Sequence, residues 1–119
     1  LVGLVGSEMC IRDRYLGGQM PQGSRLALFG DGPLMMRYKG DKTQQAIEMY
    51  VNLAKKYEID PAQLAIQFCN IQPFVTSTII GATTMEQLKT CIDSVDLDIT
   101  KEIINEIRSI HKEIPNPAP

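Results

Sequence analysis

Ser77-Thr-Ile-Ile-Gly-Ala-Thr-Thr-Met-Glu-Gln87 is the stretch of sequence that decides the fold. It continues a run rich in β-branched residues that begins at Phe74, and it passes through Gly81 into the start of a helix. Continuous Val, Thr and Ile content is typical of a parallel strand that is buried on both faces. We therefore predict a strand over 75–80. One strand cannot form a sheet, so this one requires partners on both sides.

Four helices are predicted around this strand, because apolar residues recur at helical spacing before and after it. Each helix has a capping residue or a capping-box pattern at its start. These residues are Asp41, Asp60, Thr84 and Thr100. The predicted helices span 42–57, 61–72, 84–93 and 101–113. The Gly- and Pro-rich stretch 15–41 is predicted as a long loop. The element order makes the chain a slice of a larger α/β protein, since the partners of its strand are missing.

Composition narrows the class of protein further. The chain has 119 residues and a formal net charge of -2, which limits it to one domain and argues against a general nucleic-acid binder. No apolar run approaches the ~20 residues needed to span a membrane. Three scattered cysteines and a single histidine, His111, predict neither a disulfide framework nor a metal site. A reducing, cytoplasmic compartment is the expected location.

The first 14 residues stand apart from the rest. Leu1–Gly6 is repetitive, and Ser7–Arg14 resembles the translation of a sequencing adapter. We interpret 1–14 as a non-native or disordered head and 15–119 as the native part. The alternative is a genuine but irregular N-terminal tail.

The turn between the predicted strand and the helix at 84–93 is the candidate binding feature. A helix N-terminus offers free backbone N–H groups and the positive end of the helix dipole, which together can hold a phosphate. The alternative is that Thr84 and Gln87 only cap the helix. No Ser/His/Asp or Cys/His set can be assembled, so the pattern predicts no catalytic residue.

Several motifs together resemble the C-terminal part of an aldo/keto reductase of the bacterial NADP(H)-dependent type. The resemblance runs from Tyr15 to Pro119 and is strongest in the block that starts at Gln72. The residues that carry it are Tyr15-Leu-Gly-Gly, Gly23-Ser-Arg25, Arg37-Tyr38, Asp60-Pro-Ala-Gln-Leu-Ala65, Gln72-Pro-Phe-Val-Thr-Ser-Thr-Ile-Ile-Gly-Ala-Thr-Thr-Met-Glu-Gln-Leu88 and Asn116-Pro-Ala-Pro119. The resemblance implies a C-terminal fragment of a (β/α)8 TIM barrel, made of the last helix–strand–helix units and a C-terminal helix.

The resemblance also implies a site for NADP(H). The adenosine phosphate end would be held by Gly81, Ala82, Thr83 and Gln87. Arg25 matches a loop arginine that pairs with the 2′-phosphate, a task that suits its planar guanidinium. Cys91 stands where the family usually has an Asn that hydrogen-bonds the adenine, and a thiol would replace that bond poorly.

The implied parent is an oxidoreductase that reduces small aldehydes and ketones by hydride transfer. The family's catalytic Asp, Tyr, Lys and His lie in the N-terminal half of the barrel, so none is carried onto this chain. We therefore expect the chain alone to be inactive and to fold poorly, because both edges of 75–80 would be unpaired. Two alternatives are a non-catalytic nucleotide-binding module, as in channel β-subunits, and a small helical interaction domain.

Overall fold

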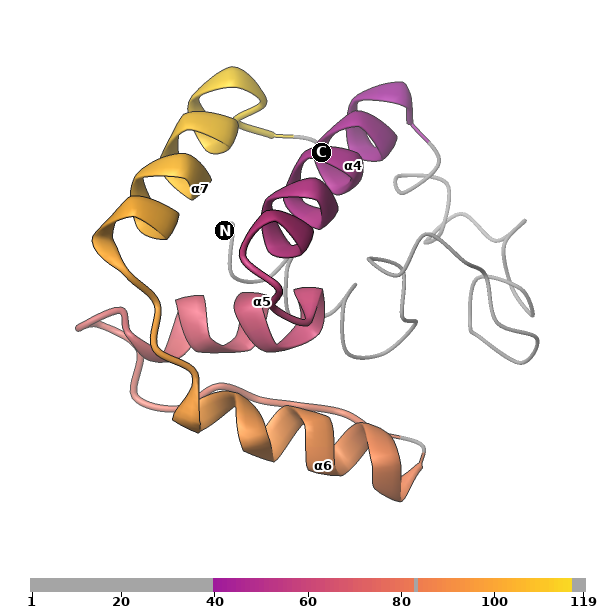
Figure 1. The fold of residues 1–119 in the computed structure, drawn as a ribbon, viewed down its shortest axis with the longest axis vertical. Helices are drawn as coiled ribbons and strands as arrows, with labels where there is room; N and C mark the ends of the chain where they lie inside the picture. Colours follow the sequence, from indigo (N-terminus) through magenta and orange to yellow (C-terminus); the bar gives the residue numbers. More distant parts are fainter. Residues whose placement is uncertain (1–39, 83, 117–119) are drawn as a thin grey trace.

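The computed structural model describes residues 40–82 and 84–116. Its helices are α4 (Asp41–Lys56), α5 (Pro61–Asn70), α6 (Met85–Asp93) and α7 (Lys101–Glu113), with the short 3-10 helix η2 (Ser94–Asp96) after α6. In Figure 1, α4 and α7 lie side by side, and α5 lies between this pair and α6. The helix bounds differ from the predicted ones by two residues at most. None of the helices in these ranges is long and apolar enough to cross a membrane.

Three of the four predicted helix starts have the expected capping residue. The side chains of Asp60, Thr84 and Thr100 accept hydrogen bonds from backbone N–H groups of the first turn of α5, α6 and α7. The prediction for α4 is wrong, because Gly40 is the N-cap and Asp41 is already helical. From that position Asp41 contributes a negative charge near the positive end of the helix dipole instead of a cap.

The end of α4 is closed by a backbone turn at Glu58, which has a φ of 55°. The N–H of Glu58 donates to the Lys55 carbonyl, and the N–H of Ile59 donates to the Ala54 carbonyl. This is the Schellman arrangement, which satisfies helix-end carbonyls through one left-handed residue. The turn places Ile59 against a cluster of buried residues that includes Leu53 and Ala54 of α4, and the chain then continues into α5.

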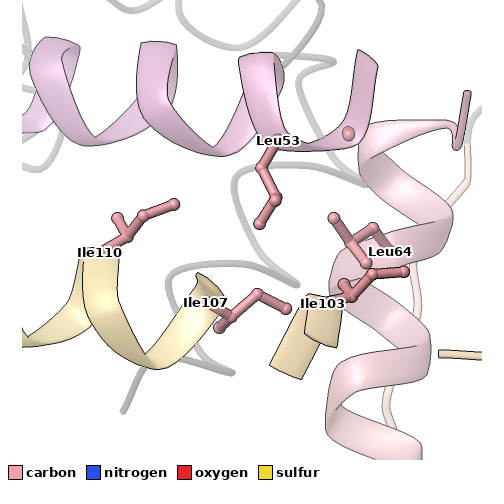
Figure 2. Packing of buried hydrophobic residues seen from close by; sticks show 6 residues of the cluster. Leu53, Leu64, Ile103, Ile107 and Ile110 are labelled. Carbon is pink, nitrogen blue, oxygen red and sulfur yellow. The ribbon is translucent and has the colours of Figure 1, made fainter. Parts of the chain in front are cut away.

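One cluster of buried side chains, called here the packed core, joins three helices. It consists of Leu53 and Ala54 from α4, Leu64 from α5, and Ile103, Ile107 and Ile110 from α7. Figure 2 shows the labelled side chains of the packed core pointing toward one another from the three helices. A second cluster of Ile47, Ile66 and Cys91 lies between α4, α5 and α6. The buried isoleucines of α7 all pack against α4 and α5, as its amphipathic pattern predicts.

Exposed polar side chains link the C-terminal end of α4 to α7. Lys56 Nζ donates to Glu106 Oε1 at 2.7 Å, and the Tyr57 hydroxyl donates to the same oxygen at 2.5 Å. These hydrogen bonds lower the pKa of Glu106, with Lys56 the larger cause, and raise the pKa values of Lys56 and Tyr57. The contact fixes the end of α4 against α7 without burying a charge.

The predicted strand over 75–80 is not formed in the described part of the chain. Residues 74–82, called here the open segment, lie between α5 and α6 without β pairing. Phe74 is 81% exposed and Ile79 is 89% exposed, where burial on both faces was expected. The physical reason is that a strand needs neighbouring strands for its backbone hydrogen bonds, and the described ranges supply none.

Two helical faces also differ from the predicted ones. Ile71 follows Leu64 and Phe68 at helical spacing, which predicts a buried position, but it is 39% exposed, whereas Ile66 is buried. On α6 and η2, Ile92 and Val95 continue the apolar stripe of Leu88 and Cys91, which predicts burial, but they are 56% and 64% exposed. Together with Phe74, Ile79 and Met85, these are the exposed large apolar side chains of the described residues, so the missing burial is concentrated in the sequence range 71–95.

Candidate functional site

The candidate site is the turn from the open segment into α6. Thr84 has an extended backbone, and its side-chain oxygen accepts a hydrogen bond from the N–H of Gln87 at 3.2 Å. The Thr84 carbonyl then accepts the first intrahelical bond from Leu88 at 3.0 Å. Because the first turn of a helix has N–H groups without intrahelical acceptors, this turn presents donors and a positive dipole end to solvent.

The glycine of this turn is not needed for the packing of the described chain. Gly81 is exposed, and a Cβ added to it would meet no atom within 4 Å. Ala82 is exposed as well. Small residues with open space around them allow a ligand to approach the backbone closely. The chemistry of the turn thus suits an anion, although the exposed carboxylate of Glu86 in the first turn of α6 disfavours one on its own side.

Cys91 occupies a different environment from the rest of the predicted set. It lies one helical turn after Gln87 and is 5% exposed, in the cluster with Ile47 and Ile66. Burial, and then the carboxylate of Asp60, raise the pKa of its thiol. The Ser94 hydroxyl donates to the Cys91 carbonyl at 2.6 Å and holds the end of α6 in place. The thiol is therefore packed against α4 and α5.

The structure brings together only part of the predicted site. Gly81 and Ala82 lie in the exposed turn, Gln87 is half-buried on the first turns of α6, and Cys91 is buried behind it. Arg25 and Thr83 lie outside the described residues. No group of three or more His, Cys, Asp or Glu side chains within 40–82 and 84–116 could hold a metal ion.

Two glutamines of α5 hold α6 and η2 in place, a role that the sequence analysis did not assign. Gln63 Nε2 donates to the Thr90 carbonyl at 3.1 Å. Gln67 Nε2 donates to the Leu97 carbonyl at 3.0 Å. Their spacing of four residues puts both on one face of α5. Amides at helical spacing within an otherwise apolar pattern were the available signal for this contact.

A family model and several known proteins match this chain in sequence. The model of the aldo/keto reductase family matches residues 11–112, so residues 11–14 of the predicted head fall within the match. Protein tas of Escherichia coli K12 is 44% identical over 106 residues, which are 89% of this chain and 30% of that protein. A probable voltage-gated potassium channel subunit beta of Oryza sativa subsp. japonica is 30% identical over 104 residues, or 86% of this chain and 32% of that protein. An aldo-keto reductase of Babesia bovis is 34% identical over 80 residues, or 65% of this chain and 28% of that protein. The chain thus spans about a third of the length of these relatives.

Proposed function

Because this chain belongs to the aldo/keto reductase family, we propose that it is the C-terminal, NADP(H)-binding portion of an enzyme that reduces aldehydes and ketones to alcohols. The family has a (β/α)8 barrel, uses NAD(P)H in general and acts on carbonyl compounds. The observation that carries the proposal is the exposed turn at Gly81 and Ala82, followed by the capped N-terminus of α6. In the proposal, this turn lies at the end of a barrel strand formed by 75–80.

The residues of the turn fit the phosphate end of such a cofactor. Gly81 leaves the backbone open to a ligand, and the first turn of α6 supplies N–H donors and the dipole. Gln87 adds a side-chain amide next to this turn. Arg25 and Thr83 complete the proposed set, with Arg25 pairing with the 2′-phosphate. The bound dinucleotide would supply the hydride, while this chain binds and orients its adenosine end.

Cys91 has the smallest share in the proposed binding. The thiol is 5% exposed and packed against Ile47 and Ile66, so it offers little surface to an adenine ring. A thiol is also a weaker hydrogen-bond partner than the amide of the Asn that the family usually has at this position. We propose that Cys91 therefore contributes less to adenine binding than an Asn at this position would.

The reduction step itself is proposed to need a longer protein. In the proposal, the catalytic Asp, Tyr, Lys and His of the family lie in a part of the barrel outside this chain, so the chain should bind the cofactor without turning over substrate. A cytoplasmic location belongs to the same proposal and draws on the free cysteines Cys69 and Cys91.

The test is a calorimetric titration of the 119-residue chain with NADPH and with NADH. We expect saturable binding of NADPH, weakened by Gln87→Ala and left unchanged by Gln45→Ala, an exposed glutamine of α4. Arg25→Ala should reduce the preference for NADPH over NADH, since only NADPH carries the 2′-phosphate. No saturable binding, or equal effects of the two glutamine variants, would contradict the proposal. Oxidation of NADPH by the chain in the presence of an aldehyde would contradict its inactivity.

A second candidate is a non-catalytic nucleotide-binding module. The observation in its favour is the similarity to the rice channel subunit beta, which extends over 86% of this chain. The sequence of a longer protein containing this chain separates the two functions. An Asp/Tyr/Lys/His set upstream favours the reductase, and its absence favours the binding module.

A further inference from the structure

One side chain of α5 reaches the helix that carries the proposed binding turn. Gln63 is half-buried, and its Nε2 donates a hydrogen bond to the Thr90 carbonyl at 3.1 Å. Thr90 is one of the last four residues of α6, whose carbonyl groups have no N–H partner within the helix. Gln63 therefore satisfies a helix-end carbonyl of α6 from the neighbouring helix.

Thr90 connects this contact to the start of α6. Its hydroxyl donates to the Glu86 carbonyl at 3.0 Å, in the first turn of the helix. Gln87, which the proposed function assigns to the cofactor, lies three residues before Thr90 and therefore on the same side of α6. Two hydrogen bonds thus lead from Gln63 through Thr90 to the residue that directly precedes Gln87.

We propose that Gln63 is a positioning residue for NADP(H) binding, which sets the orientation of Gln87 and of the first turn of α6 without touching the cofactor. The proposal rests on the proposed function, in which this turn holds the adenosine phosphate end. Side chains hold a ligand well only when packing and hydrogen bonds fix them in place. Gln63 supplies the hydrogen bond, and the contact of Cys91 with Ile66 supplies packing between the same two helices.

This contact does not depend on the strands that residues 75–80 require as partners. Both helices lie in the described part of the chain, and Figure 1 shows α5 beside α6. Helices form the outer ring of a (β/α)8 barrel, and successive helices are neighbours in that ring. The contact between Gln63 and Thr90 is therefore compatible with the barrel of the proposed function.

Gln67 makes a similar contact at a different place and provides a matched control. Its Nε2 donates to the carbonyls of Leu97 and Val95 at 3.0 and 3.4 Å, and its Oε1 accepts from Asn70 at 3.2 Å. Val95 and Leu97 follow α6, so Gln67 holds the connection to α7. Because Gln67 makes more hydrogen bonds than Gln63 within the described ranges, a purely structural effect should be at least as large at Gln67.

Calorimetric titration of the 119-residue chain with NADPH tests the proposal. Gln63→Met keeps the length of the side chain but removes the donor, so it should raise the dissociation constant roughly threefold to tenfold. Gln67→Met removes a donor from the same helix and should raise the dissociation constant by less than about twofold. Equal effects of the two variants, or binding that Gln63→Met leaves unchanged, would overturn the proposal.

Two further measurements separate positioning from a loss of stability. Gln63→Met combined with Gln87→Ala should weaken binding by less than the product of the two single effects, because both changes act through α6. Gln67→Met combined with Gln87→Ala should give the full product. In the chain without cofactor, hydrogen exchange of the Leu88 amide, which donates to the Thr84 carbonyl, should rise more with Gln63→Met than with Gln67→Met.

The outcomes distinguish this role from the proposed function itself. Independent effects of Gln63→Met and Gln87→Ala, or loss of the fold in Gln63→Met and not in Gln67→Met, would make Gln63 a structural residue and overturn the positioning role. The proposed function would stand in both cases, provided that the unsubstituted chain binds NADPH. Absence of binding by the unsubstituted chain would contradict the proposed function and the positioning role together.

Discussion

Ile107 and Ile79 carry the same side chain, yet Ile107 is 4% exposed and Ile79 is 89% exposed. Ile107 belongs to α7, whose helix satisfies its own backbone hydrogen bonds, so its apolar stripe needs only another apolar surface. Ile79 belongs to the open segment, whose backbone needs neighbouring strands before both of its faces can be buried; Ile80 already packs against Ile47, Ile66 and Cys91, and Ile79 does not. The helices thus form and bury their apolar faces from residues within this chain. Burial of Ile79 instead requires strands that the described residues do not supply, in a chain that spans 30% of the length of a relative.

The largest expected effect comes from truncating the packed core. Ile107→Ala should lower the free energy of unfolding by about 2–5 kcal/mol, because it removes buried methyl groups and leaves a cavity among Leu53, Leu64 and Ile110. Ile79→Ala should change it by less than about 0.5 kcal/mol, since the same deletion at an exposed site loses little. Urea denaturation of the dilute chain measures both, and a cooperative transition of the unsubstituted chain would itself contradict the poor folding expected from the unpaired strand. Similar losses for the two variants would show that the open segment is buried in solution.

An intermediate effect is expected from the helix caps. Asp60 Oδ1 accepts hydrogen bonds from the N–H groups of Ala62 and Gln63 at 2.9 and 3.2 Å, at the start of the central helix α5. Asp60→Ala should therefore cost about 1 kcal/mol of global stability. Thr84→Ala removes the corresponding cap of α6, beside the open segment.

The two caps should differ in the range of their effects. Since α6 makes fewer buried contacts than α5, Thr84→Ala should mainly fray its first turn. Amide hydrogen exchange at Gln87 would rise while the denaturation midpoint changes little. If Thr84→Ala lowered the midpoint as much as Asp60→Ala, α6 and the packed core would form one cooperative unit, and the contrast between the two regions would not hold.

The same contrast explains which features could be predicted from the sequence. Caps and apolar periodicity are local, so the helices begin and end near their predicted bounds. Asp41 was misplaced because Gly40 adopts the extended backbone of an N-cap just as readily. The strand over 75–80 and the burial of Ile92 depend on distant partners, which no local pattern in this chain supplies.

The candidate site also combines features that follow from local sequence with features that depend on distant residues. The turn at Gly81 and the cap at Thr84 follow from local sequence, and the structure has both. The inward position of Cys91 depends on packing against Ile47 and Ile66, residues far away in the sequence. The supporting bond from Gln63 to the Thr90 carbonyl is equally non-local. Which side chains of α6 are buried therefore depends on the fold as well as on the local motif.

The smallest expected effect is at the surface contact of Glu106 with Lys56 and Tyr57, since exposed ion pairs contribute little. The folded pKa of Glu106 is lowered, so its contribution is present above the unfolded pKa and is lost as the pH falls through the folded one. The folded pKa values of Lys56 and Tyr57 are raised, so their contribution is present at neutral pH and is lost as the pH rises through the folded values.

The stability difference between the unsubstituted chain and Glu106→Gln should therefore be greatest near neutral pH and shrink toward both extremes. Denaturation midpoints measured across the pH range test this, with Glu48→Gln, an exposed carboxylate of α4, as the matched control. A constant difference for Glu106→Gln would mean that the side chain acts through packing and not through its charge. Repeating the comparison in an Ile79→Lys background should leave the pH dependence of the Glu106→Gln effect unchanged. The reason is that the Glu106 contact joins α4 and α7 and does not involve the open segment.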